Sequence, residues 1–154
     1  MNDTTHLRTE FTAALIQASR QWRRTVEREL EEFGVSEACA APLIWIARLG
    51  GGVRQVTLAS YVGIEGPSMV RLLDQLGAAG LIERRDDPTD RRAKTVWLTE
   101  EGEHLAARIE VLLVGVRSRV LADVSRDDIL TAMRVLRAFE DAPQRSLQVD
   151  EAAS

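Results

Sequence analysis

Apolar residues recur at steps of three or four along most of the chain, which predicts a largely helical protein. The first such segment, residues 7–33, places Leu7, Phe11, Leu15, Ala18, Trp22, Val26, Leu30 and Phe33 on one face. At ~1.5 Å per residue this helix would be about 40 Å long, which exceeds what one compact domain of this size requires. We therefore expect something outside the domain to cover part of it.

Three shorter helices are expected in the middle of the chain. Ser36 is the expected N-cap of the first, and Thr57 the expected N-cap of the second. The third begins at Gly66 and Pro67, because a proline at the first helical position lacks only an N–H that would have no helical partner. Gly80 is expected to end it.

Period-two patterns follow these helices. Residues 81–86 and 94–98 are predicted to be two short strands, and residues 87–90 carry turn-forming side chains. Helical periodicity resumes at Thr99, and Ser125 is expected to cap a last helix. Two short helices, a turn and a β-hairpin are the order of a winged helix-turn-helix, whose second helix can enter a major groove of DNA.

Charge limits how such a protein could bind nucleic acid. The 154 residues include 20 basic and 24 acidic side chains, a net charge of -4, which argues against binding through bulk attraction. DNA affinity would have to be local. All basic residues except Lys94 are arginine, whose planar guanidinium suits bidentate contacts to phosphate or guanine.

The helix that starts at Gly66 carries the candidate base-reading residues. Between its apolar positions lie Ser68, Arg71 and Gln75, which could reach base edges or phosphates, and Pro67 stands at its leading end. A helix N-terminus also offers free N–H groups to a phosphate. Arg71 is the strongest candidate for a base contact.

The hairpin supplies a second set of candidates. Residues 83–94 hold five basic and four acidic side chains, so placement matters more than the net charge of +1. Arg91 and Arg92 follow the turn, where a protruding hairpin could insert a guanidinium into the minor groove, and Asp90 would orient them. Arg84 and Arg85 could contact phosphate or could only pair with Asp86 and Asp87 across the hairpin.

Two stretches of this region resemble the MarR family of bacterial transcription regulators, and within it the SlyA-like branch. Residues 62–76 are similar to that branch's recognition helix. Residues 90–99 fit the family's wing signature, which is an Asp, any residue, an Arg, five residues and then Leu-Thr. The resemblance covers about residues 30–105 closely.

The resemblance implies a single MarR-type domain over residues 1–154 that acts as a homodimer. Residues 7–33 and 99–140 would be dimerisation helices flanking a winged helix-turn-helix at 53–98. It further implies sequence-specific binding to a pseudo-palindromic operator in double-stranded DNA, most often as a repressor, and release by a small phenolic or aromatic carboxylate. An effector is expected between the dimerisation helices and the winged module.

Several residues admit a functional and a structural interpretation. Trp22 and Trp45, with Arg71, are candidate effector-binding residues, but both tryptophans also fit core or dimer packing. Cys39 is either a peroxide sensor or a small buried thiol. His104 has no second ligand at metal spacing.

Other classes of function find no support in the sequence. No nucleophile elbow or kinase signature is present, and the acidic residues fit solvated helix faces, so we expect no enzyme, catalytic residue, metal or cofactor. No signal peptide or apolar run long enough for a bilayer is present, which predicts a cytoplasmic protein. The remaining alternative is a winged-helix module that binds another protein and not DNA.

Overall fold

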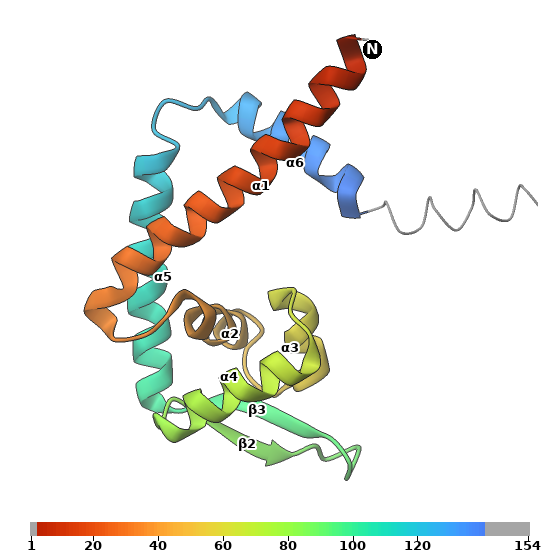
Figure 1. Cartoon of the computed structure of the whole chain (residues 1–154). Helices are drawn as coiled ribbons and strands as arrows, with labels where there is room; N and C mark the ends of the chain where they lie inside the picture. The colour runs from red at the N-terminus through yellow and green to blue at the C-terminus, as the bar shows by residue number, and fades with distance from the viewer. Residues whose placement is uncertain (1–2, 141–154) are drawn as a thin grey trace, which may run out of the picture. The chain divides into compact units, whose positions relative to one another are not determined.

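Residues 3–140 are described by a computed structural model, in which helices predominate over a small antiparallel sheet (Figure 1). The chain divides into two compact units, one ending at Val116 and one beginning at Arg117. The elements are α1 (Asp3–Leu30), η1 (Glu31–Phe33), α2 (Glu37–Arg48), β1 (Val53–Arg54), α3 (Gln55–Val62), α4 (Gly66–Ala78), β2 (Ile82–Asp86), β3 (Lys94–Leu98), α5 (Glu100–Val120) and α6 (Arg126–Glu140). The predicted mostly helical architecture is confirmed.

Two of the expected helix caps are formed. The Ser36 hydroxyl accepts a hydrogen bond from the backbone N–H of Cys39 at 3.2 Å, a contact worth about 1 kcal/mol to the start of α2. The Ser125 hydroxyl accepts from the backbone N–H of Asp128 at 3.1 Å and starts α6 in the same way.

The predicted cap at Thr57 is wrong. Helix α3 begins at Gln55, its N-cap is Arg54, and no side chain caps it. Residues Val53 and Arg54 form β1, which pairs with β3 through Val53↔Val96 and Arg54↔Thr95. Pairing in the sheet therefore fixes where α3 starts, and no local side chain is needed.

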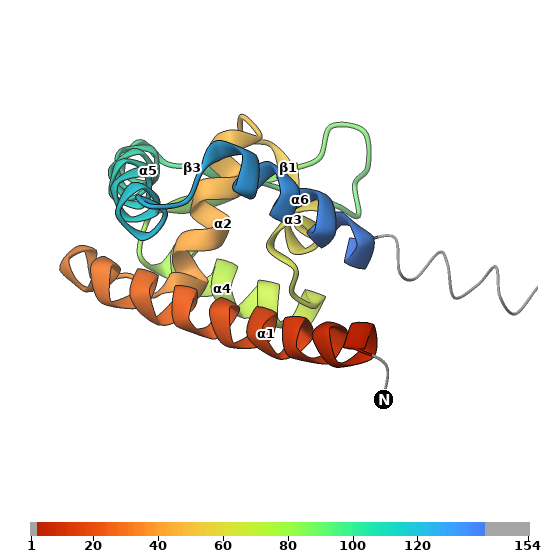
Figure 2. The same ribbon diagram turned by 90° about the horizontal axis from the view of Figure 1, so that it is seen from above.

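The sheet has three antiparallel strands in the order β1-β3-β2. Strands β2 and β3 form the predicted hairpin, with Ile82 opposite Leu98 and Asp86 opposite Lys94. The loop between them projects beyond α3 and α4 in Figure 1, and Figure 2 shows the same loop from above. This hairpin and its loop, residues 82–98, are called the wing below.

A single apolar core joins α2, α3, α4 and the sheet to the C-terminal end of α1 and the first half of α5. Its fully buried side chains include Leu30 of α1, Leu43 of α2, Leu58 of α3, Leu73 of α4 and Ile109 of α5. Burial of one leucine of this kind contributes about 1.5–3 kcal/mol. The core therefore holds the winged helix-turn-helix as one body with α5 up to Val116.

A tight junction connects the end of α4, the start of β2 and the start of α5. The Thr99 hydroxyl donates to the carbonyl of Gly80 at 2.7 Å and accepts from the backbone N–H of Gly102 at 3.0 Å. The backbone N–H of Thr99 donates to the carbonyl of Leu81 at 3.1 Å. A Cβ added at Gly102 would lie 2.0 Å from that carbonyl oxygen, so only glycine permits this approach.

Helix α6 is amphipathic, but none of its residues is buried. Ile129, Leu130 and Met133 retain 36%, 50% and 48% of their surface exposed. No helix in the described part of the chain is long and apolar enough to cross a membrane.

Candidate nucleic-acid interface

The start of α4 leaves backbone N–H groups without a side-chain cap. The turn after α3 is made by Gly63 in the left-handed conformation (φ 77°), and Glu65 then enters α4 with extended backbone and no capping hydrogen bond. Pro67 occupies the first turn, as predicted. The positive end of the α4 dipole and the free backbone N–H groups of the first turn can therefore bind an anion such as a DNA phosphate.

Helix α4 turns most of its large apolar side chains toward the core, whereas Val70 is 40% exposed. Met69, Leu73 and Leu76 are buried against the core. The four residues predicted to face DNA are all exposed: Pro67, Ser68, Arg71 and Gln75.

Cys39 and Gln75 meet across α2 and α4. The Cys39 thiol, half-buried and free of any disulfide, donates to Oε1 of Gln75 at 3.4 Å. A DNA contact through Gln75 would compete with this weak hydrogen bond.

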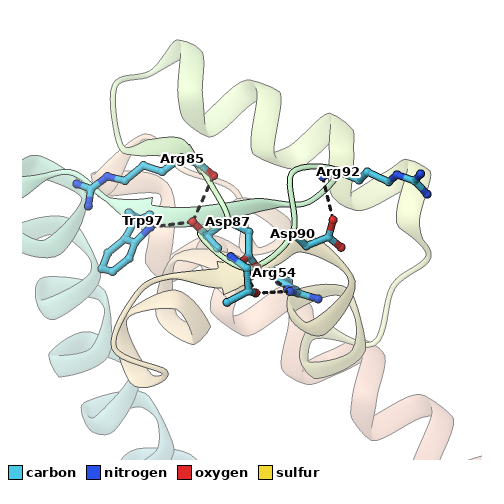
Figure 3. Close-up of polar contacts among 8 residues, drawn as sticks. Arg54, Arg85, Asp87, Asp90, Arg92 and Trp97 are labelled. Atoms are coloured by element: carbon cyan, nitrogen blue, oxygen red, sulfur yellow. Dashed lines mark hydrogen bonds and ion pairs between the residues drawn. The ribbon is translucent and has the colours of Figure 1, made fainter.

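The loop of the wing exposes both arginines that the sequence singled out. Arg91 and Arg92 are exposed, and half-buried Asp90 accepts a hydrogen bond from the backbone N–H of Arg92 at 3.0 Å. Asp90 thus holds the loop backbone, not a guanidinium. Figure 3 shows the Arg92 side chain pointing away from the polar contacts at the base of the loop.

The other basic residues of the wing are engaged in ion pairs. Arg84 pairs with Asp74 of α4 at 2.7 Å, Arg85 pairs with Glu83 on the same strand, and Lys94 pairs with Asp86 across the hairpin. Of the two interpretations left open for Arg84 and Arg85, the pairing with Asp86 and Asp87 is wrong, because Asp86 faces Lys94 in the β2–β3 register and Asp87 bonds to Arg54.

A polar cluster of Arg54, Asp87 and Thr89 holds the base of the wing loop to β1 (Figure 3). Arg54 Nε donates to Asp87 Oδ2 at 2.7 Å, and the backbone N–H and hydroxyl of Thr89 donate to Asp87 Oδ1 at 2.8 and 2.7 Å. These bonds, first those from Thr89 and then that from Arg54, lower the pKa of Asp87 to about 2.

Sequence reasoning missed Arg54 as a part of this site. The spacing Asp87-Pro88-Thr89 does signal a turn in which a carboxylate accepts from the residue two positions on. Nothing local indicates that a residue 33 positions earlier supplies the cation.

The three candidate effector residues have separate surroundings. Trp22 is half-buried and packs against the core, and Trp45 contacts Tyr61 with ring centroids 4.8 Å apart. Arg71 lies exposed on α4. A cavity between α2, β3 and α5 is lined by Trp97 and by none of these three residues, so their effector role remains a prediction.

No group of three or more His, Cys, Asp and Glu side chains that could hold a metal ion occurs among residues 3–140.

Three helices followed by an antiparallel hairpin, with the third helix exposing polar residues, define a winged helix-turn-helix protein. A family model described as "MarR family" matches residues 33–93. The transcriptional regulator PA3341 is 36% identical, with 88% of this chain and 98% of that one covered and a TM-score of 0.80. The chain belongs to the MarR family of transcriptional regulators.

More distant structures share the fold. Staphylococcus aureus MepR, solved in a complex with DNA, is 20% identical over 86% of this chain and 95% of its own, with a TM-score of 0.78. Staphylococcus aureus MarR, solved with salicylate and kanamycin, is 21% identical over 91% of this chain and 94% of its own, also with a TM-score of 0.78.

Proposed function

We propose that this protein regulates transcription by binding a specific double-stranded DNA operator through α4 and the wing. Pro67, Ser68, Arg71 and Gln75 address the major groove, and Arg91 and Arg92, on a loop held by Asp90, address the minor groove. The DNA complex of the similarly folded MepR is consistent with this role.

The observation that carries the proposal is how the basic residues of the wing are paired. Three of the five are held by acidic partners within the described residues, Arg84 by Asp74, Arg85 by Glu83 and Lys94 by Asp86. Arg91 and Arg92 have no ion pair in residues 3–140 and stand on the projecting loop. The local cation needed by a protein of net charge -4 is therefore concentrated where a groove would be.

We also propose that the acting form is a homodimer of a single MarR-type domain, with residues 7–33 and 99–140 as dimerisation helices. Ile129, Leu130 and Met133 give α6 an apolar stripe that this chain leaves exposed, and Leu7 and Ile16 of α1 are 56% and 54% exposed. A twofold dimer would place the two copies of α4 roughly 34–36 Å apart, in successive major grooves of a pseudo-palindromic operator.

A small ligand would release the dimer from DNA by changing that spacing. The protein would then be a repressor that leaves its operator when the ligand binds. Such a ligand must bind more tightly to the dimer with one spacing of its two α4 helices than to the dimer with the other spacing.

Fluorescence anisotropy with a labelled duplex from the region upstream of the coding sequence tests the proposal. We expect saturable binding that a shuffled duplex does not reproduce, and an affinity that falls steeply between two salt concentrations. Equal, weak binding to every duplex would contradict specific regulation and favour a protein-binding module. Light scattering of the protein eluting from a size-exclusion column measures its mass. A dimer mass is expected, and a monomer mass would contradict the proposed homodimer.

A further inference from the structure

A cavity lies between the C-terminal half of α2, the glycine loop 50–52, the end of β3 and the first half of α5. Its volume is about 490 Å³, within the range of small-molecule sites. Ile44, Leu98 and Ala106 supply apolar walls, and Arg48, Glu103 and Glu110 supply charged groups. All of these residues belong to the unit that ends at Val116.

Trp97 forms a wall of the cavity whose position is fixed by close contacts. A Cβ added at Gly51 would lie 2.7 Å from Cε3 of Trp97, and one added at Gly52 would lie 2.8 Å from Cζ2, so the indole rests directly on glycine backbone. Trp97 Nε1 donates to the Thr95 hydroxyl at 3.0 Å, and the Arg85 guanidinium lies 4.6 Å from the ring centroid. A wall held in this way costs little further ordering when a ligand binds.

The charged groups of the lining do not cancel. Arg48 Nη2 pairs with Glu110 Oε1 at 2.6 Å, and this pair leaves the carboxylate of Glu103 as the excess charge of the lining. An anionic ligand would meet two carboxylates and an arginine that is already paired. A cationic ligand would be attracted by the carboxylate of Glu103, and its apolar part would cover Leu98 and Ala106.

We propose that this cavity binds a small aromatic cation, an amine or amidinium carried on a flat apolar body, and not the aromatic carboxylate or phenol that the family resemblance implies. The binding step stands on the cavity alone, and only its consequence for DNA rests on the proposed function. Strand β3 connects the cavity to the wing loop. Trp97 and Leu98 at the end of β3 line the cavity, and Lys94 at the start of β3 adjoins the wing loop.

Calorimetry on the full-length protein with two matched probes, 2-naphthylmethylamine and 2-naphthoate, tests the choice of ligand class. We expect the amine to bind at least tenfold more tightly at neutral pH. Equal affinities, tighter binding of the naphthoate, or no binding of the amine would overturn the proposal.

Two variants locate the site. Glu103→Gln should weaken amine binding about threefold to fivefold, the size expected of one exposed charge pair, and leave naphthoate binding unchanged or stronger. Glu101→Gln, which removes an exposed carboxylate from the same helix outside the lining, should change neither affinity. Ala107→Leu places extra volume in the cavity on an exposed helical position and should abolish amine binding; full binding by this variant would place the ligand elsewhere.

The same amine added to a protein–operator complex separates this inference from the proposed function. Calorimetric binding of the amine by a protein that ignores the operator would support the cation site and contradict the DNA-binding role. Operator binding by a protein that does not bind the amine would do the opposite.

Discussion

Helix α4 and the wing both present arginine to solvent, but the two regions differ in how their charges are engaged. In α4, Arg71 is exposed and forms no ion pair within residues 3–140. In the wing, Arg84, Arg85 and Lys94 are each paired with a carboxylate. Availability to a duplex is therefore decided by pairing, and a count of basic residues overstates what the wing offers.

The two regions are also held in different ways. Helix α4 is fixed by apolar burial of Met69, Leu73 and Leu76. The wing loop is fixed by the polar cluster of Arg54, Asp87 and Thr89. Apolar burial is insensitive to pH near neutrality, whereas a cluster built on a carboxylate depends on its ionisation.

The largest effect is expected at the junction on which both regions depend. Gly102→Ala places a Cβ 2.0 Å from the carbonyl oxygen of Leu81, and the backbone there has no room to yield without opening the α4–β2–α5 junction. Alanine favours a helix by about 1 kcal/mol over glycine, but overpacking of this severity costs about 3 kcal/mol. We expect a net loss of about 2 kcal/mol in the free energy of unfolding, measured by urea denaturation at fixed protein concentration.

Gly77→Ala is the matched control. Gly77 is also helical, but it is exposed and has no atom within 4 Å of an added Cβ. The substitution should be neutral or should stabilise the protein by about 0.5–1 kcal/mol. Equal losses from the two variants would show that the junction is not tightly packed.

The next largest effect concerns α4 as the reader of bases. Arg71→Ala should cost about 1–3 kcal/mol of operator binding and reduce the preference over a shuffled duplex, if the guanidinium makes a bidentate base contact. Arg71→Lys keeps the charge but not the planar fork, so it should retain the salt dependence and still lose preference. Unchanged preference in both variants, measured by anisotropy, would assign Arg71 to phosphate contacts.

A smaller effect, without loss of preference, is expected from the wing. The double variant Arg91→Ala/Arg92→Ala should weaken operator and shuffled duplexes alike by about 1–2 kcal/mol and lower the salt slope by about 2. Arg23→Ala/Arg24→Ala makes the same change in net charge on the exposed face of α1 and should leave the slope unchanged. Full affinity in the wing variant would remove the wing from the interface.

Local sequence patterns predicted much of the fold. The features that they did not predict depend on contacts between residues far apart in the sequence. Ser36 and Ser125 cap helices as expected because a cap depends on residues a few positions away. Strand β1 has only two residues, too few to show alternation, and it exists because β3 lies beside it. The same strand sets the start of α3 that Thr57 was expected to set.

The candidate interface likewise has features that the local sequence predicted and features that depend on distant residues. The exposed positions of α4 follow from helical periodicity, which is why Ser68 and Arg71 were placed correctly on its solvent face. The partners of Arg84 and Arg85 did not follow, because Asp74 comes from another element and Glu83 lies two residues away on the same face of β2. Trp97 forms a wall of the cavity because its indole rests on the backbone of Gly51 and Gly52, 46 and 45 positions earlier.

The smallest effect should come from the polar cluster that holds the wing loop. Asp87→Asn removes the charge that accepts from Thr89 and Arg54, so the wing loop loosens and the thermal midpoint falls slightly, while α4 stays in place. Because the pKa of Asp87 is lowered from 3.8 to about 2, its ionised form stabilises the folded state. That contribution is complete above about pH 4 and is lost as the pH falls through 2.

The difference in thermal midpoint between wild type and Asp87→Asn should therefore be constant from neutral pH down to about pH 5, shrink below pH 4 and vanish only below pH 2. Asp86→Asn, at a carboxylate whose side chain is 76% exposed, should lower the midpoint less at neutral pH. Operator affinity of Asp87→Asn should fall no further than that of the double arginine variant, because the loop acts through those two side chains. A larger fall in affinity, or a midpoint difference that stays at its neutral-pH size at pH 2, would mean that Asp87 supports more of the protein than the wing.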